Sequence, residues 1–337
     1  MKITIARLRS NVKYNGPLET VLDSFFENYV KWMKANPQHQ YDTYNVSFDT
    51  SRPKRTPETI DWADVIVIPS DSEFRYHGEL QMNPKDLAKS ESHMETIRPF
   101  FEGKDVIMFR SDRGDTEELY RSFLPGIKKF TTIDECDPAF GANIHGMKYH
   151  FIQTLKNPLA DMMGMEKTKD FGYWGRLGKW SVPEEKNVRE RIIRQIYRSE
   201  ISTVLVGGGY PSGVERDAGW IKEWKILYPM LEPCRATLCW NWRDSESNTS
   251  RYVESLSIGM VPFVFGSYDK NNTYAIDPWQ RITSAEEVIE KLLLLRNEDF
   301  FQNKLKEFRA NYSKVLLSQE EYFEAFSNKM HLGVDKP

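Results

Sequence analysis

Short apolar runs alternate with longer amphipathic segments along the first half of the chain. Residues 65–68 and 106–109 are β-branched or apolar, with an acidic residue before each run and turn-forming residues after it. Buried strands of a parallel sheet have this composition. Residues 18–34 place their apolar side chains at helical spacing. The pattern therefore predicts strands, opening with residues 3–6, and helices that connect them.

The alternation starts afresh after residues 150–170, where Asn157-Pro158 and Gly164 separate mixed segments. Residues 285–328 contain no proline and are helical in pattern almost throughout. The sequence thus predicts a second strand-helix domain followed by a long helical tail. Its expected strands are 171–175, 202–206, 236–240 and 261–265, and its expected helices are 184–198 and 250–258.

The length of 337 residues is roughly twice the ~150 residues at which a single core becomes comfortable. We expect an α/β fold with one Rossmann-like domain over residues 1–165 and a second over 166–310. A helical tail over residues 311–337 should pack back toward the first domain. Open α/β sheets bind ligands at the carboxyl ends of their strands, so two such domains facing each other predict a ligand site in the cleft between them.

Composition is that of a folded protein, with 40% apolar residues, 28% charged residues and a mean hydropathy of -0.60. No apolar run reaches the ~18–20 residues that span a bilayer, and the start lacks a signal-peptide core, so we expect a cytoplasmic protein with no membrane contact. The three cysteines have no CxxC spacing, which supports neither a disulfide framework nor a cysteine zinc site. Nothing in the sequence points to a protein partner.

Basic residues gather in the first half of the chain. The net charge of -3 nevertheless argues against a protein that binds polyanions through the electrostatic field of the whole molecule. Clusters of this kind are more commonly solvated faces, and a local nucleic-acid contact is the alternative. The clustered residues are Arg7, Arg9, Lys13, Arg52, Lys54, Arg55, Arg110, Arg113, Arg121, Lys128 and Lys129.

A glycine-rich segment from Gly172 to Lys179 follows the expected strand at 171–175. Backbone amides around Gly175, with the cations of Arg176 and Lys179, could hold a diphosphate there. The segment is neither GxxxxGK[ST] nor GxGxxG, so it defines no nucleotide-binding family alone. A surface turn with solvated charges is an equally good interpretation.

Arg251 and Glu254 lie one turn apart on the expected helix at 250–258, which can be capped by Thr249 or Ser250. An arginine at a helix start suits a phosphate, and a carboxylate one turn later can accept both hydroxyls of a ribose. The alternative is an i,i+3 ion pair worth ~0.2–0.5 kcal/mol. That alternative does not explain why Gly259-Met260-Val261-Pro262 then leads directly into a strand.

Arg-x-x-Glu on a short helix, followed by a small-residue turn and an apolar strand, resembles the donor-binding element of GT-B glycosyltransferases. Across most of the chain the order of motifs is similar to that of the DNA β-glucosyltransferases of T-even phages. Met1-Lys2-Ile3 resembles their first strand, and Phe109-Arg110-Ser111-Asp112 resembles the strand that ends in their catalytic aspartate. Tyr228-Pro229-Met230 resembles the Ile-Pro-Met of their uracil pocket.

The resemblance implies roles for individual residues. Asp112 would be the general base, with Asp115 as the alternative, and Glu19 would orient the sugar or the acceptor. The implied donor-binding residues are Gly175, Arg176, Lys179, Tyr228, Arg251 and Glu254. No protein metal site is implied and the chain has no convincing DxD pair, although a loosely held Mg²⁺ could assist departure of the UDP.

The implied activity is inverting transfer of a sugar from a UDP-sugar to the hydroxymethyl group of a modified cytosine in double-stranded phage DNA. Glucose is the implied sugar and arabinose the alternative. Reaching a base in a duplex would require flipping it out of the stack. Two other readings stay open: a GT-B enzyme acting on a glycan, lipid or small molecule, and a non-catalytic protein that binds sugar nucleotides or DNA.

Overall fold

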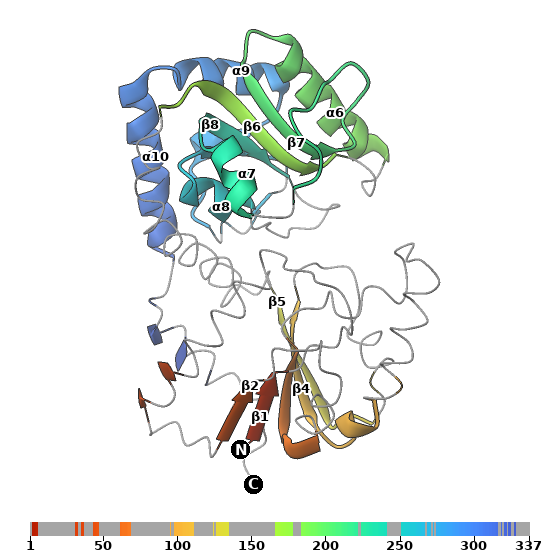
Figure 1. Ribbon diagram of the computed structural model, residues 1–337. Coiled ribbons are helices and arrows are strands. Elements are labelled where there is room, and N and C mark those ends of the chain that lie inside the picture. The colour runs from red at the N-terminus through yellow and green to blue at the C-terminus, as the bar shows by residue number, and fades with distance from the viewer. Residues whose placement is uncertain are drawn as a thin grey trace. The chain divides into compact units, whose positions relative to one another are not determined.

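The computed structural model describes the strands and helices of two regions of the chain (Figure 1). The described residues are 2–5, 31–32, 35–36, 43–46, 61–68, 95, 98–110, 124, 126–134, 166–177, 183–221, 224–240, 251–266, 268–270, 272, 274–315, 318, 320–321, 323–324 and 327. Contacts divide the chain into two compact units, one of Met1–Phe140 with Leu317–Pro337 and the other of Gly141–Leu316.

The first unit contains a five-stranded parallel sheet in the order β2-β1-β3-β4-β5. Ile66 and Ile68 pack on one face of this sheet with Phe101, which ends the short 3-10 helix Arg98–Phe101. Phe323, close to the C-terminus, lies with its ring centroid 5.7 Å from that of Trp32. The strands are β1 (Lys2–Ile5), β2 (Thr43–Val46), β3 (Val65–Ile68), β4 (Asp105–Arg110) and β5 (Lys129–Asp134).

The second unit contains another five-stranded parallel sheet, in the order β10-β9-β8-β6-β7. Because all the strands run the same way, their carboxyl ends meet at one edge of the sheet. The strands are β6 (Lys169–Arg176), β7 (Thr203–Gly208), β8 (Cys234–Cys239), β9 (Val261–Phe265) and β10 (Arg281–Ile282), and the helices are α6 (Pro183–Arg198), α7 (Trp224–Leu231), α8 (Arg251–Ser257), α9 (Ala285–Leu294) and α10 (Glu298–Ser313).

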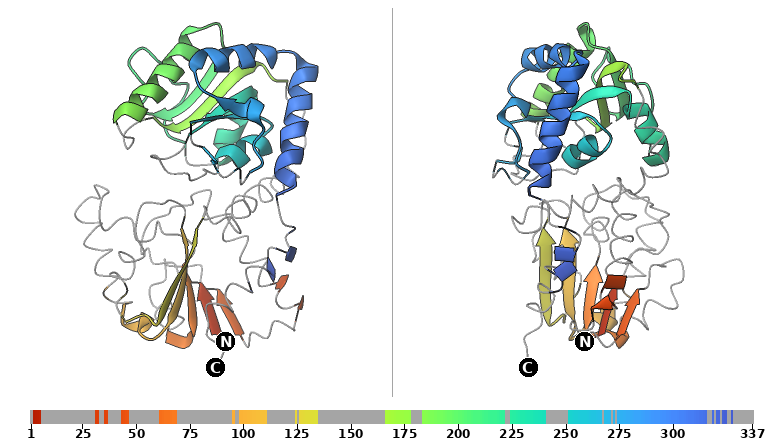
Figure 2. Two further views of the ribbon diagram at one scale, coloured as in Figure 1. Left: turned by 180° about the vertical axis from the view of Figure 1, so that it is seen from behind. Right: turned by 90° about the vertical axis from the view of Figure 1, so that its left-hand side faces the viewer.

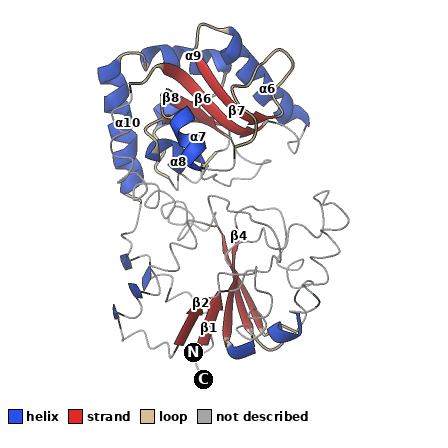
Figure 3. Ribbon diagram, viewed as in Figure 1, coloured by secondary structure: helices blue, strands red, loops and turns tan. Residues whose placement is uncertain are grey.

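Successive residues of these strands supply two separate cores, as the period of two requires. Tyr173 and Leu205 pack with α6, α9 and α10, whereas Trp174 and Val206 pack with α7. Figures 2 and 3 show the same division, with α6 and α9 on one side of the sheet and α7 on the other. Helix α8 contributes to the first core, and Ile258 just after it to the second.

Most of the expected strands agree with the structure to within a few residues, and the α/β class is confirmed. The sequence pattern missed α7, because Pro229 lies inside that helix and proline argues against a helix interior. It also missed β2, β5 and β10. The expected helical tail is broken at residues 295–297, where Asn297 caps α10 by accepting a hydrogen bond from the Phe300 amide. Of the expected helix at 18–34, only Lys31 and Trp32 are described, and both are helical.

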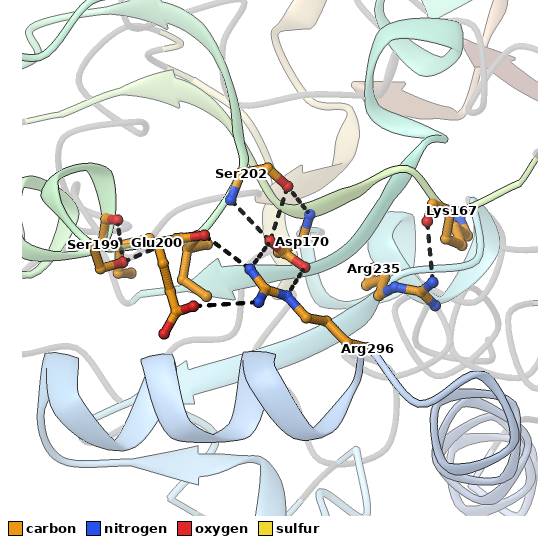
Figure 4. Close-up of polar contacts among 9 residues, drawn as sticks. Lys167, Asp170, Ser199, Glu200, Ser202, Arg235 and Arg296 are labelled. Carbon is orange, nitrogen blue, oxygen red and sulfur yellow. Dashed lines mark hydrogen bonds and ion pairs between the residues drawn. The ribbon is translucent and has the colours of Figure 1, made fainter.

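Asp170, at the start of β6, is the polar centre of the amino edge of the second sheet (Figure 4). Its carboxylate accepts two hydrogen bonds at 3.0 Å from Nε and Nη2 of Arg296, and two more from Ser202. Burial would raise the pKa of Asp170, but these hydrogen bonds outweigh it and hold the pKa below its usual value. The turn between α9 and α10 is thereby fixed to the sheet.

Replacing Arg296 by methionine should lower the free energy of unfolding by about 2–3 kcal/mol, because a buried carboxylate would lose its cation. An aspartate with a lowered pKa stabilises the fold above its ordinary pKa, and this contribution disappears as the pH falls through the folded value. The cost of Arg296→Met should therefore be full at pH 7 and shrink below about pH 4. Urea unfolding at both pH values measures it. Glu200→Gln, which removes the exposed second partner of Arg296, is the matched control and should cost under ~0.5 kcal/mol.

Candidate functional site

Backbone packs directly against backbone where β6 and β7 end. Gly175 and Gly207 have φ angles of 114° and 119°, which favour glycine. A Cβ atom on Gly207 would overlap the carbonyl oxygen of Gly175, and one on Gly209 would overlap that of Leu177. The Leu177 amide also donates to the Gly208 carbonyl at 3.0 Å. These contacts bring the loops after the two strands together without any side chain between them.

Polar side chains fix the loop that follows β7. The Tyr210 hydroxyl donates to the Val206 carbonyl at 3.0 Å, and burial raises its pKa, so it stays protonated and able to donate. The carboxylate of Asp217 accepts from the Leu205 amide at 2.7 Å. Arg216 donates to the Gly207 carbonyl at 3.0 Å. The loop is therefore held at several points along its length.

Helix α8 reaches the same edge of the sheet and has only seven residues, of which Tyr252 to Ser257 are buried. Its second residue is anchored by the Tyr252 hydroxyl, which donates to Oε1 of Gln280 at 3.1 Å. The Gln280 side chain in turn donates to the Pro262 carbonyl of β9 at 2.8 Å. Because so short a helix is marginal by itself, these tertiary contacts decide where its first residue, Arg251, lies.

The guanidinium of Arg251 lies over the aromatic rings that flank the end of β6. Its Cζ is 4.7 Å from the ring centroid of Tyr173 and 5.0 Å from that of Trp174. A Cβ atom on Gly175 would come within 2.5 Å of Nη2 of Arg251. Glycine at 175 therefore leaves the space that the guanidinium occupies.

Arg251 forms no ion pair with a carboxylate among the residues that the structure describes, and its buried Nε has no hydrogen-bond partner there. Burial opposes its charge, but Tyr173, Cys239 and Glu254 outweigh burial and keep its pKa above the usual value. Since a buried charge is costly unless it is paired, this cation is suited to an anionic ligand.

Tyr228 and Glu254 lie near each other beside Arg251. Glu254 is 5% exposed, on the second turn of α8, and Tyr228 is 8% exposed, on α7. Burial, and then the negative charge of Glu254, raise the pKa of the Tyr228 hydroxyl well above its usual value. The structure thus brings four of the expected site residues together at one edge: Gly175, Tyr228, Arg251 and Glu254.

The other expected site residues lie partly or wholly outside the described part of the chain. Arg176 is the last residue of β6, and its side chain is not among the described ones. Lys179, Glu19 and Asp112 fall outside the described residues altogether. Their assigned roles stay predictions.

The sequence patterns did not indicate a role for the aromatic pair Tyr173 and Trp174 or for the glycine run Gly207-Gly208-Gly209. A signal was present in both cases, since two aromatic residues directly precede Gly175 and three glycines end an apolar strand. Within the described ranges, no group of three or more His, Cys, Asp or Glu residues could hold a metal ion. Among the same residues, no helix is long and apolar enough to cross a membrane.

Comparison with known proteins gives matches in structure only. No protein-family model matches the sequence, and no curated protein matches it either. T4 phage β-glucosyltransferase in complex with UDP and Mn²⁺ aligns with a TM-score of 0.61 and 13% identity, over 100% of both chains. A further structure of that enzyme gives a TM-score of 0.59 at 13% identity, again over 100% of both chains. An α-glucosyltransferase in complex with UDP-glucose and DNA containing an abasic site aligns at 0.50 and 10% identity, over 96% of this chain and 98% of that one.

The chain therefore has the fold of the GT-B glycosyltransferases, with two α/β units that are each built on a parallel sheet. Within that class it is similar over its whole length to T4 phage β-glucosyltransferase.

Gly175→Ala should lower the free energy of unfolding by roughly 2–4 kcal/mol, because it combines a strained φ angle with a collision against Arg251. Gly266→Ala is the matched control, since Gly266 also has a positive φ, of 64°, but open space around its Cβ position. It should cost only about 1 kcal/mol. Urea unfolding of both variants tests the difference, and equal costs would contradict the strain assigned to the φ angle of Gly175.

Proposed function

We propose that the protein is an inverting glycosyltransferase that moves a sugar from a UDP-sugar to the hydroxymethyl group of a modified cytosine in double-stranded DNA. The fold supports an enzyme of the GT-B class. The observation that carries the proposal is the guanidinium of Arg251, whose buried Nε has no hydrogen-bond partner, which forms no ion pair with a described carboxylate and which lies at the carboxyl edge of a parallel sheet.

A diphosphate is the anion that fits this edge best. The guanidinium can donate two parallel hydrogen bonds to phosphate oxygens, and the backbone of Gly175 lies directly beside it. As the bond to the sugar breaks, negative charge develops on the β-phosphate of the departing UDP. Arg251 is already desolvated and held by two rings, so it would stabilise that charge without reorganising. Arg176 and Lys179 would supply the further cations.

Glu254 and Tyr228 suit the nucleoside half of the donor. A carboxylate can accept hydrogen bonds from both hydroxyls of a ribose, and Glu254 lies one helical turn from the phosphate-binding arginine. Tyr228 offers an apolar ring for the uracil and a protonated hydroxyl near Glu254. The two residues would thus select a ribonucleotide over a deoxyribonucleotide.

The transfer itself needs a base for the acceptor hydroxyl. Asp112 would remove the proton as that oxygen attacks the anomeric carbon, and Glu19 would orient the sugar or the acceptor. One carboxylate acting in a single displacement gives inversion at the sugar. A divalent cation such as Mg²⁺, bound mainly by the diphosphate, would neutralise charge on the leaving group; the T4 phage enzyme was solved with UDP and Mn²⁺.

The acceptor is proposed as DNA on two grounds. The α-glucosyltransferase neighbour was solved with DNA, and the first 130 residues of this chain carry three clusters of basic side chains. A base in a duplex must leave the stack to be modified, and contacts with the phosphate backbone would make the affinity fall as salt rises. Glucose is the first sugar to try, followed by arabinose.

Incubation with each UDP-sugar and hydroxymethylcytosine DNA, followed by digestion to nucleosides and mass spectrometry, tests the whole proposal. A nucleoside heavier by one sugar is the expected product. Donor hydrolysis that is indifferent to added DNA would point instead to a glycan, lipid or small-molecule acceptor. UDP binding without turnover on any acceptor would point to a non-catalytic protein.

Arg251→Met should weaken UDP binding at least about 100-fold, because it removes charge-assisted hydrogen bonds worth about 1.5–3 kcal/mol each. Isothermal titration calorimetry with UDP measures the change. Arg281→Lys is the matched control, because the guanidinium of Arg281 donates only to the carbonyls of Tyr268 and Asp269 among the described residues. It should leave the UDP affinity within about twofold.

Asp112→Asn should lower turnover by about 10²- to 10⁴-fold and leave the dissociation constant of UDP unchanged, since a general base acts in the transition state alone. Asp115→Asn is the comparison, and it should retain most of the activity. The reverse outcome would assign the base to Asp115. Equal, small losses in both variants would remove this part of the proposed mechanism.

A further inference from the structure

Three cations gather at the amino edge of the second sheet, at the other end of α8 from Arg251. Lys167 precedes β6, Arg235 is the second residue of β8, and Arg309 lies on α10. Arg235 donates to the Lys167 carbonyl at 3.1 Å and pairs with Glu298, the first residue of α10, at 2.6 Å. The cluster thus joins the start of the sheet to the last helix of the unit.

Arg309 caps the C-terminus of α8. Its Nε and Nη2 atoms donate to the same carbonyl, that of Leu256, at 2.9 and 2.7 Å. The last carbonyls of a helix lack partners within the helix, and a cation there also complements the helix dipole. Gly259 follows with a φ of 80°, and a Cβ atom on it would lie 3.7 Å from Nη2 of Arg309. Arg309 therefore lies directly against the turn that ends α8.

Lys167 does the same for α7, the helix that carries Tyr228. Its ammonium donates to the carbonyl of Glu232, one residue beyond the helix. A Cβ atom on Gly259 would lie 3.5 Å from this ammonium, so Lys167 and Arg309 lie on the same turn. The two helices that hold the expected nucleoside-binding residues are thus both fastened at their far ends by cations.

We propose that Arg309 is a positioning residue of the nucleotide site, which fixes Arg251 and Glu254 by holding the C-terminus of α8. The inference rests on the proposed function, because it concerns the same site. Among the described residues, Arg309 donates to the carbonyl of Leu256, at the opposite end of α8 from Arg251. Its effect on Arg251 would therefore pass through the helix between them.

The geometry of a short helix explains how a change at one of its ends can displace a residue at the other end. Leu256 and Arg251 are five residues apart, which is roughly 8 Å along the helix axis. A tilt of about 10° at the capped end would move the other end by more than ~1 Å, and an error of that size can lower activity by about 100-fold. The Tyr252 hydroxyl holds the second residue of α8, and Val253 and Leu256 pack in the core. Arg309 adds a contact that fixes the C-terminal end of the helix.

The test compares Arg309→Met with Arg296→Met. Both remove a guanidinium from the same unit, but Arg296 contacts Asp170 and Glu200 and no described residue of α7 or α8. UDP binding by calorimetry, well below the melting temperatures of both variants, should weaken about tenfold for Arg309→Met and less than twofold for Arg296→Met. Arg309→Lys, which keeps the charge and one donor, should fall between them and serves if the methionine variant does not fold.

A double-mutant cycle separates positioning from general loss of stability. If Arg309 acts through Arg251 and Glu254, the loss of UDP affinity in the Arg251→Met/Arg309→Met protein should be clearly smaller than the sum of the two single losses. Additive losses would overturn the inference, as would equal effects of the Arg309 and Arg296 variants. In either case tight UDP binding by the unaltered protein would leave the proposed function standing. Failure of the unaltered protein to bind UDP would remove the proposed function itself.

Discussion

The constraint on which the second unit depends is the placement of one positive charge, that of Arg251, which forms no ion pair with a carboxylate in the described structure. Two aromatic faces receive the guanidinium, and a glycine leaves room for it. An ion pair in the same position would have satisfied the charge within the protein, leaving less for a ligand. The fold instead holds the guanidinium by packing against rings, and its charge stays available for the anionic ligand that we propose.

The amino and carboxyl edges of the second sheet are held by different kinds of interaction. At the amino edge, ion pairs join described charges, as Asp170 with Arg296 and Arg235 with Glu298 show. At the carboxyl edge, backbone packs on backbone, polar side chains bond to main-chain groups, and the guanidinium of Arg251 lies over two rings. The ligand site that we propose and the charge pairs thus lie at opposite edges of the sheet. Helix α8 crosses between them, with one end in each region.

Patterns of apolar residues were sufficient for most strands, because buried parallel strands leave short β-branched runs such as Val65–Ile68 and Val261–Phe265, but not for β2, β5 and β10. The spacing of Arg251 and Glu254 was sufficient to place both on one helix, since i and i+3 share a face. Contacts between residues that lie far apart in the sequence could not be predicted from such patterns. Tyr173 and Trp174 look like ordinary strand residues until α8 folds over them, and Arg309 looks like a surface cation of α10. Proline inside α7 hid that helix, because proline in a sequence pattern argues against a helix interior.

Main-chain contact between Gly175 and Gly207 also limits how this edge could change over time. A side chain adapts by choosing another rotamer, but two touching peptide groups have no such freedom. Most substitutions at these two positions would therefore be incompatible with the fold, whereas the segments around them could accept more changes. A lineage that came to prefer a different sugar would be expected to keep this corner fixed and to vary the loops that surround it.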